Sequence, residues 1–234
     1  MLQRVREQRP QYNNDARITS SVTVSYFKLF YYQIFAVFYS MAGRCAELAF
    51  VNSSWTEGHI SGLWGTAKTK DAGHYTPRLV KVFPPCNSEE FSQISLDQQR
   101  ETIVLSVGQF RPEKDHMLQI KALKLLIATD PNKYGHVKLV LIGGSRNAGD
   151  DALVEKLKLF SRTNDDGTVS EKENPNVEFI VNAPFSLMRE YMKKSLIGLH
   201  TMWNEHFGIS VVELMAAGLV VIAHDSGGPS MDIV

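Results

Sequence analysis

Two glutamates, Glu205 and Glu213, lie near the C-terminus with seven residues between them. Glu205 falls in a polar loop at 202–208 (MWNEHFG), and Glu213 falls in the apolar stretch that follows it (ISVVELMAAG). If a helix begins near Gly208, its free N–H groups and the positive end of its dipole suit a phosphate. Two glutamates at this distance are common, however, and solvated surface carboxylates would also explain them.

Other turns carry groups that could join the same chemistry. Arg111 and Lys114 lie in the turn GQFRPEK, and fixed cations can stabilise the negative charge of a leaving phosphate, although exposed turns are usually solvated surface. Gly143 ends an apolar run, where glycine lets a backbone approach a ligand or simply turn tightly. Gly227 and Gly228 belong to a Ser-Gly-Gly-Pro turn, which could offer N–H groups to the ligand or be an ordinary turn.

The elements that must position these residues alternate regularly from Thr102 onward. We expect strands at 102–108, 137–143, 177–181, 197–201 and 219–223, and helices at 115–128, 151–160, 186–194 and 209–217. Such alternation indicates βαβ units and a parallel sheet, which binds ligands at the carboxyl ends of its strands. The fold class is therefore α/β.

The N-terminal part of the chain reads differently. Residues 1–85 contain two expected strands, 47–52 and 79–83, and a helix capped at Ser53–Ser54, which is too little for an independent α/β domain. The first fifteen residues read as a surface helix or a frayed end. Two prolines and the polar run 87–101 look like a linker, so the sequence predicts a boundary between 1–85 and 86–234.

Residues 26–43 (YFKLFYYQIFAVFYSMAG) are apolar on nearly every face. As a helix they would extend about 27 Å, at the lower limit for crossing a bilayer. Lys28 and Gln33 lie inside the segment. Three interpretations stay open: a helix packed in the protein or on a partner, a helix lying at a membrane interface, or a span.

Composition narrows the classes of partner and cofactor. The 25 basic and 25 acidic residues give a net charge of zero, so nothing suggests a nucleic-acid partner. Cys45 and Cys86 have no motif spacing, which fits a reducing compartment and argues against a zinc site. The sequence lacks a dinucleotide fingerprint, a phosphate-binding P-loop and a cluster of metal ligands.

Several stretches of the sequence resemble a known family. EHFGISVVE, with AAG after the second glutamate and SGGP further on, resembles the E-x7-E signature of retaining glycosyltransferases with the GT-B fold of two Rossmann-like domains. HTMWNEHFGISVVELMAAG, VGQFRPEKDH and VLIGGSRN are similar to the GDP-mannose-dependent alpha-1,2-mannosyltransferases that extend the dolichol-linked oligosaccharide for asparagine-linked glycosylation. The likeness runs from about Tyr12 to the C-terminus.

The resemblance implies roles for individual residues. Glu205, the catalytic candidate, would hold hydroxyls of the transferred sugar near its leaving bond, and Glu213 would bind the ribose hydroxyls of the nucleotide. Lys114 matches the family lysine aimed at the donor diphosphate, whereas Gln109 stands where the family has an arginine, with Arg111 two residues later. His200 is interpreted as a satisfied core histidine. The expected donor-binding residues are Arg111, Lys114, Gly143, His206, Phe207, Gly208, Ile209, Glu213, Gly227 and Gly228.

The resemblance also implies a reaction and a cellular setting. Mannose would pass from GDP-mannose to a lipid-linked oligosaccharide with retention, without a metal or other cofactor. The expected setting is the cytosolic face of the endoplasmic reticulum membrane, with other mannosyltransferases of the pathway as further partners. Residues 86–234 would form a nearly complete nucleotide-sugar-binding Rossmann-like domain, and 1–85 the trailing part of the acceptor domain.

Two further expectations follow from that division. The chain alone would not transfer mannose, since the family pattern extends beyond both of its ends. The alternatives are another GT-B sugar-nucleotide enzyme, a glucosyltransferase or an epimerase, and an inactive nucleotide-sugar-binding fragment.

Overall fold

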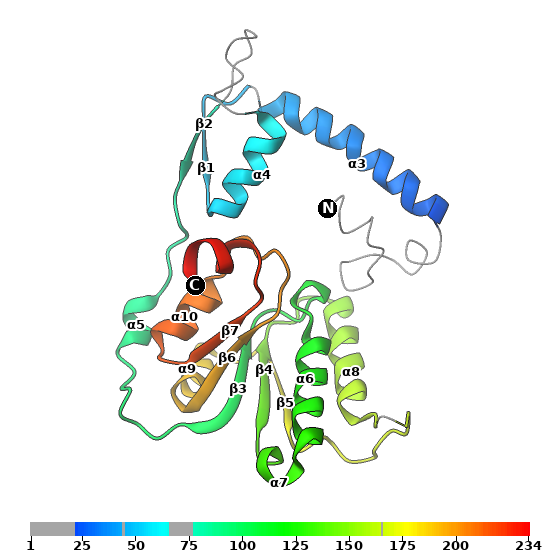
Figure 1. Ribbon diagram of the computed structural model, residues 1–234, viewed down its shortest axis with the longest axis vertical. Helices are drawn as coiled ribbons and strands as arrows, with labels where there is room; N and C mark the ends of the chain where they lie inside the picture. Colours follow the sequence, from blue (N-terminus) through cyan, green and yellow to red (C-terminus); the bar gives the residue numbers. More distant parts are fainter. Residues whose placement is uncertain (1–21, 44, 66–76, 165) are drawn as a thin grey trace.

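The computed structural model describes residues 22–43, 45–65, 77–164 and 166–234 (Figure 1). The expectation for the first fifteen residues lies outside these ranges. The helices are α3 (Val22–Gly43), α4 (Ser54–Trp64), α5 (Ser88–Ser92), the 3-10 turn η3 (Pro112–Lys114), α6 (His116–Thr129), α7 (Pro131–Tyr134), α8 (Ala148–Arg162), α9 (Phe185–Lys194), α10 (Ile209–Ala216) and the π-helical turn η4 (Pro229–Ile233). The strands are β1 (Leu48–Val51), β2 (Arg78–Lys81), β3 (Glu101–Val107), β4 (Lys138–Gly143), β5 (Val177–Val181), β6 (Ser195–His200) and β7 (Val220–Ala223).

Five of the strands form one parallel sheet in the order β5-β4-β3-β6-β7, which confirms the α/β expectation. The chain builds outward from β3 through β4 to β5, and then returns to the other side of β3 with β6 and β7. Loops that leave β3 and β6 therefore diverge to opposite faces of the sheet. The crevice at such a reversal of strand order is where open α/β sheets bind ligands.

Helices cover both faces of this sheet (Figure 1). Side chains alternate along each strand, so Ile103 and Leu105 pack toward α9 and α10, whereas Val104 packs toward α6 and α8. Strands buried on both faces need nearly continuous apolar runs, which explains sequences such as TIVLSV and KLVLIG.

The run expected to be a linker is instead part of the domain. It forms α5, whose Phe91 is fully buried in the core cluster under α9 and α10, together with Ile94. Arg100 donates hydrogen bonds to the carbonyl oxygens of Met192, Ser195 and Ala217, which lie at the C-terminal ends of α9 and α10. From the polar composition of this segment we did not predict that Phe91 and Ile94 are buried or that Arg100 caps the C-terminal ends of two helices.

The N-terminal part contributes β1 and β2, a parallel pair that carries α4. The C-terminal turn η4 holds this unit, since the Asp232 carboxylate accepts hydrogen bonds from the Ser54 N–H (2.8 Å) and the Ser54 hydroxyl (2.5 Å). Lys81 lies 3.6 Å from the same carboxylate. An anion at the N-terminus of α4 also complements the helix dipole.

The helix α3 extends away from the rest of the described chain (Figure 1). Most of its aromatic side chains are exposed, with Tyr26 at 67%, Phe27 at 72% and Phe38 at 64%. Near its C-terminal end the helix packs on α4, where the Tyr39 and Trp64 ring centroids lie 5.5 Å apart, but most of its aromatic surface is not buried. Contact of that surface with a partner or a membrane interface stays a prediction. Among the described residues, no helix combines the length and the apolar character that a membrane crossing requires.

Candidate functional site

A cavity of about 670 Å³ opens at the carboxyl ends of β3 and β6, the point where the strand order reverses. The loop after β3, the loop after β6 and the first turns of α10 form most of its walls, and Asn52 and Pro84 complete them. The structure brings eight of the expected site residues to this cavity. They are Arg111, Lys114, Glu205, His206, Phe207, Gly208, Ile209 and Glu213.

Lys114 and Glu205 form an ion pair at the edge of the cavity, with 2.6 Å between Lys114 Nζ and Glu205 Oε2. The backbone beside each partner is left-handed: Asp115 has φ 49° and Asn204 has φ 52°. Asp and Asn tolerate this conformation better than other residues with a side chain, and such positions often lie at functional sites. The two turns bring together the side chains of Lys114 and Glu205, which lie 91 positions apart in the sequence.

Several groups fix the Glu205 carboxylate in its charged form. Its Oε1 atom accepts a hydrogen bond from the His206 N–H at 3.0 Å, and His200 Nε2 lies 3.3 Å from Oε2. Burial alone would raise the pKa of Glu205, but the contacts with His200 and Lys114 outweigh burial and hold this pKa well below its ordinary value. Glu205 is therefore an acceptor for hydrogen bonds and not a proton donor.

Glu213 has a different environment. It projects from α10 into the cavity while Val211 and Leu214 on the same helix are buried in the core. Among the described residues, its carboxylate has no hydrogen bond or ion pair, and burial raises its pKa. A half-buried carboxylate without a partner leaves both of its oxygens available to a ligand.

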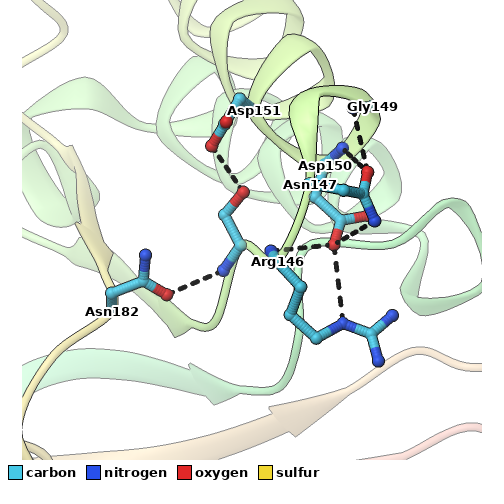
Figure 2. A network of polar contacts seen from close by, with 7 residues as sticks. Arg146, Asn147, Gly149, Asp150, Asp151 and Asn182 are labelled. Carbon is cyan, nitrogen blue, oxygen red and sulfur yellow. Dashed lines mark hydrogen bonds and ion pairs between the residues drawn. The ribbon is translucent and has the colours of Figure 1, made fainter.

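The N-terminus of α10 is also available. Asp115 caps α6, and Asn147 caps α8 by accepting hydrogen bonds from the Gly149 and Asp150 N–H groups. Figure 2 shows the α8 cap within a network that continues to Asp151 and Asn182. The helix α10 instead begins at Gly208, at φ 111°, without a side-chain cap, as its sequence predicts. Its first turn, Ile209–Ser210, lines the cavity and suits an anion.

The glycines of the Ser-Gly-Gly-Pro turn do not line the cavity; they hold the loop that carries Glu205. We expected their N–H groups to face the ligand, but the Gly228 N–H donates to the Glu205 carbonyl oxygen at 2.8 Å. A Cβ on Gly227 would lie 2.3 Å from that same oxygen, and Gly227 has φ 67°. Both positions require glycine because the two backbones are in contact.

Gly143 also lies outside the lining of the cavity. A Cβ there would lie 1.9 Å from the Gly108 carbonyl oxygen and 3.2 Å from the Phe110 ring. The glycine therefore allows the end of β4 to pack against the loop after β3. The expected contact of Gly143 with the donor stays a prediction. The close packing of the two backbones already explains why this position requires glycine.

His200, interpreted from the sequence as a satisfied core histidine, is buried but not satisfied. Its side chain is 3% exposed, and neither ring nitrogen makes a hydrogen bond with any residue that the structure describes. Its Nε2 edge faces Glu205, so the structure adds it to the site. The apolar run around it (IGLHT) gave no signal of this role, because the contact depends on a loop that turns back over the strand end.

Aromatic contacts from the N-terminal part were also missed. Trp55 stacks on His206 at 5.1 Å between ring centroids, and Phe83 stacks on Phe207 at 5.3 Å. Trp55 also stacks on His59, with 5.4 Å between the ring centroids. These contacts attach β2 and α4 to the residues directly after Glu205, and no sequence periodicity links segments this far apart.

Comparisons with known proteins agree with this geometry. The family model "Glycosyl transferases group 1" matches residues 87–234, and the model "ALG11 mannosyltransferase N-terminus" matches residues 1–64. The chain is 46% identical over 238 residues to the mouse protein named GDP-Man:Man(3)GlcNAc(2)-PP-Dol alpha-1,2-mannosyltransferase, and 44% identical over 238 residues to the human protein of that name. These alignments cover 100% of this chain and 45% of each relative, so the chain spans about half the length of the curated relatives it matches.

Solved structures share the fold at low sequence identity. An alpha,alpha-trehalose-phosphate synthase (UDP-forming) from Burkholderia xenovorans matches with a TM-score of 0.64 and 12% identity, over 82% of this chain and 49% of that one. WaaG, a glycosyltransferase involved in lipopolysaccharide biosynthesis, matches with a TM-score of 0.51 and 20% identity, over 79% of this chain and 46% of that one. The fold is thus of the GT-B type. With the family model covering more than half of its residues, the chain belongs to the family of glycosyl transferases group 1.

Proposed function

We propose that the full-length protein transfers mannose from GDP-mannose to a lipid-linked oligosaccharide, with retention and in alpha-1,2 linkage. Full-length protein here means one that carries this sequence together with the remaining length of its relatives. One observation carries the proposal: Lys114, Glu205, Glu213 and the uncapped N-terminus of α10 converge on one cavity where the strand order reverses. The names of relatives 44–46% identical to the chain supply the donor and the acceptor.

The donor diphosphate would lie between Lys114, Arg111 and the first turn of α10. Negative charge develops on the diphosphate as the sugar leaves, and fixed cations and helix N–H groups stabilise that charge. Arg111 lines the cavity together with Gln109, so it can supply the charge that the family places two residues earlier, at the Gln109 position. We propose that these groups do so without a metal or other cofactor.

The two carboxylates would bind the two sugars on either side of the donor diphosphate. Glu213, unpaired and half-buried on α10, would accept hydrogen bonds from the ribose hydroxyls. Glu205, charged and fixed by Lys114, would accept hydrogen bonds from hydroxyls of mannose near the bond that breaks. Hydrogen bonds to charged acceptors are stronger than neutral ones, which favours accurate placement of the sugar.

The remaining proposals concern the setting of the enzyme. We propose that the protein works at the cytosolic face of the endoplasmic reticulum membrane, with GDP-mannose and a lipid-linked oligosaccharide as its substrates. Other mannosyltransferases of the same pathway are proposed as further partners. The exposed aromatic side chains of α3 are compatible with contact with a membrane surface or a partner.

Mannosyl transfer by the full-length protein tests the proposal. The protein would be incubated with a dolichol-linked acceptor that ends in Man(3)GlcNAc(2) and with GDP-mannose, UDP-glucose or ADP-glucose. We expect transfer from GDP-mannose alone and removal of the new sugar by an alpha-1,2-specific mannosidase. Glu205→Gln is the matched inactive control. Transfer from UDP-glucose instead would identify a glucosyltransferase, and no transfer from any donor would refute the proposal.

A further inference from the structure

Three polar side chains are buried close to Lys114, Thr201 and Glu205, and none of them lines the cavity. His116 is 3% exposed, Gln119 is 2% exposed and His200 is 4% exposed. His116 Nδ1, Gln119 Oε1 and both nitrogens of His200 have no hydrogen-bond partner in the described chain. Buried polar atoms in folded proteins are nearly always paired, so this cluster requires an explanation.

His200 is the member of the cluster that reaches the site. Its Nε2 atom lies 3.3 Å from Glu205 Oε2, the same oxygen that accepts the 2.6 Å hydrogen bond from Lys114. The charged and titratable groups around the ring are Glu205 from the following loop, Lys114 from the loop after β3 and His116 from α6. Lys114 already balances the charge of Glu205. A hydrogen on Nε2 of His200 fits this environment, because the Nε2–H group can donate to the Glu205 carboxylate.

The two groups on Glu205 Oε2 differ in mobility. Lys114 has a long flexible side chain and, under the proposed function, a second partner in the donor diphosphate. His200 lies at the end of the inner strand β6, where its carbonyl oxygen accepts a hydrogen bond from the His224 N–H at 2.9 Å. A group on a rigid strand can hold the carboxylate when the lysine turns toward the phosphates.

We propose that His200 is a positioning residue for Glu205, donating from Nε2 to Oε2 and thereby fixing which face of the carboxylate meets the transferred sugar. The inference rests on the proposed function and adds a residue to its site. His200 is not among the residues that line the cavity, so we expect it to act through Glu205 and not on the donor directly.

Kinetics of matched variants of the full-length protein test the proposal. His200→Gln keeps an N–H donor near the position of Nε2, whereas His200→Phe keeps the ring volume and removes the donor. We expect His200→Phe to lower kcat by up to about 100-fold, the scale of an ångström-sized misplacement, with the KM for GDP-mannose nearly unchanged. His200→Gln should recover most of the rate. Full kcat in a folded His200→Phe variant, or equal losses in both variants, would overturn the proposal.

The tautomer of His200 gives a second test that does not depend on activity. Nitrogen-15 spectra of histidine-labelled protein should show hydrogen on Nε2 of His200 at neutral pH, with the signal assigned by its loss in His200→Gln. Hydrogen on Nδ1 alone, which leaves Nε2 without a donor, would overturn the proposal. A wild-type protein that fails to transfer mannose would count against the proposed function alone, because the tautomer would still decide the role of His200.

Discussion

Lys114 and Glu205 neutralise each other across the cavity, although each is assigned to a different part of the donor. The ammonium group has three N–H donors and can turn toward a phosphate oxygen when the donor binds. The pairing with Lys114 helps to hold Glu205 ionised. Substitutions at the two glutamates should therefore separate sugar placement from nucleotide affinity.

Glu205→Gln should abolish mannosyl transfer by the full-length protein while GDP affinity stays the same or rises. The amide cannot replace the charged acceptor for the sugar, and its loss of charge frees Lys114 for the diphosphate.

Glu213→Gln should weaken GDP binding as well, since a charge-assisted hydrogen bond contributes about 1.5–3 kcal/mol, or roughly 10- to 150-fold in affinity. Titration calorimetry with GDP would measure both, with melting temperatures as the folding control. Wild-type transfer rates in both variants would reduce the pair to ordinary surface charge.

Binding of GDP-mannose should also depend on pH through Glu213. Burial raises the pKa of this carboxyl above the ordinary value of 4.5, so protonation begins at a higher pH than for an exposed glutamate. Protonation removes the charged acceptor, and affinity should therefore be highest above this pKa and decrease as the pH falls through it. The pKa of Glu205 is shifted the other way, so Glu205 stays ionised over the same range. Affinities measured from pH 7 to pH 4 should fall for the wild type and stay flat for Glu213→Gln; parallel curves would contradict the assignment.

At the scale of elements, the loop 204–208 is held from three sides. The Gly227–Gly228 turn contacts the loop through the Gly228 N–H, which donates to the Glu205 carbonyl oxygen. Trp55 stacks on His206 from the side of α4, and Phe83 stacks on Phe207 from the strand β2. The N-terminal part thus contacts the two residues directly after the catalytic candidate.

Replacing Trp55 by alanine should loosen this loop without unfolding the sheet. An aromatic pair contributes about 0.5–1.5 kcal/mol beyond the area that it buries, and Trp55 makes two such contacts. Hydrogen exchange of the amides in 204–208 should become faster by about 2- to 10-fold, while the amides of β3 and β4 stay protected. Trp55→Phe, which keeps a stacking ring, is the matched control. Unchanged exchange in the alanine variant would show that the stack does not support the loop.

Local pattern predicted most of the elements but few of the contacts between them. The strand at 177–181 and the start of α10 at Gly208 were predicted correctly, because apolar runs and glycine caps are local signals. The segment 87–101 was wrong as a linker, since two buried apolar side chains among polar neighbours give no periodicity. His200 was interpreted as a satisfied core histidine, and the stacking of Trp55 on the loop was not predicted, because both contacts depend on loops that meet only after the sheet has formed.

The roles of the glycines illustrate the same limit. Ser-Gly-Gly-Pro and Gly-Gly are common both beside ligands and at tight turns, and the sequence does not distinguish a free N–H from one that is used. The geometry does, since a Cβ on Gly228 would lie 2.4 Å from Phe207 Cα. The family resemblance located the acidic and basic residues of the site, whereas the backbone contacts that support them required the structure.

At the scale of the whole molecule, the reversal of strand order between β3 and β6 decides where the site lies. Two loops from opposite sides of that reversal supply Lys114 and Glu205, and α10 supplies Glu213 and an uncapped N-terminus. These parts all lie within the 148 residues matched by the glycosyl transferase family model, from residue 87 to residue 234. We therefore expect this chain to contain the donor site, whatever the acceptor requires from the rest of the protein.

Thermal unfolding of the purified chain with different sugar nucleotides tests this claim most directly. At a concentration 100 times its Kd, a ligand stabilises the folded state by about 2.7 kcal/mol, which raises the Tm of a chain of this size by about 5–10 °C. We predict this increase with GDP-mannose and not with UDP-glucose or ADP-glucose, and its loss in Lys114→Met. No increase with GDP-mannose, or an equal increase with all three nucleotides, would contradict the account.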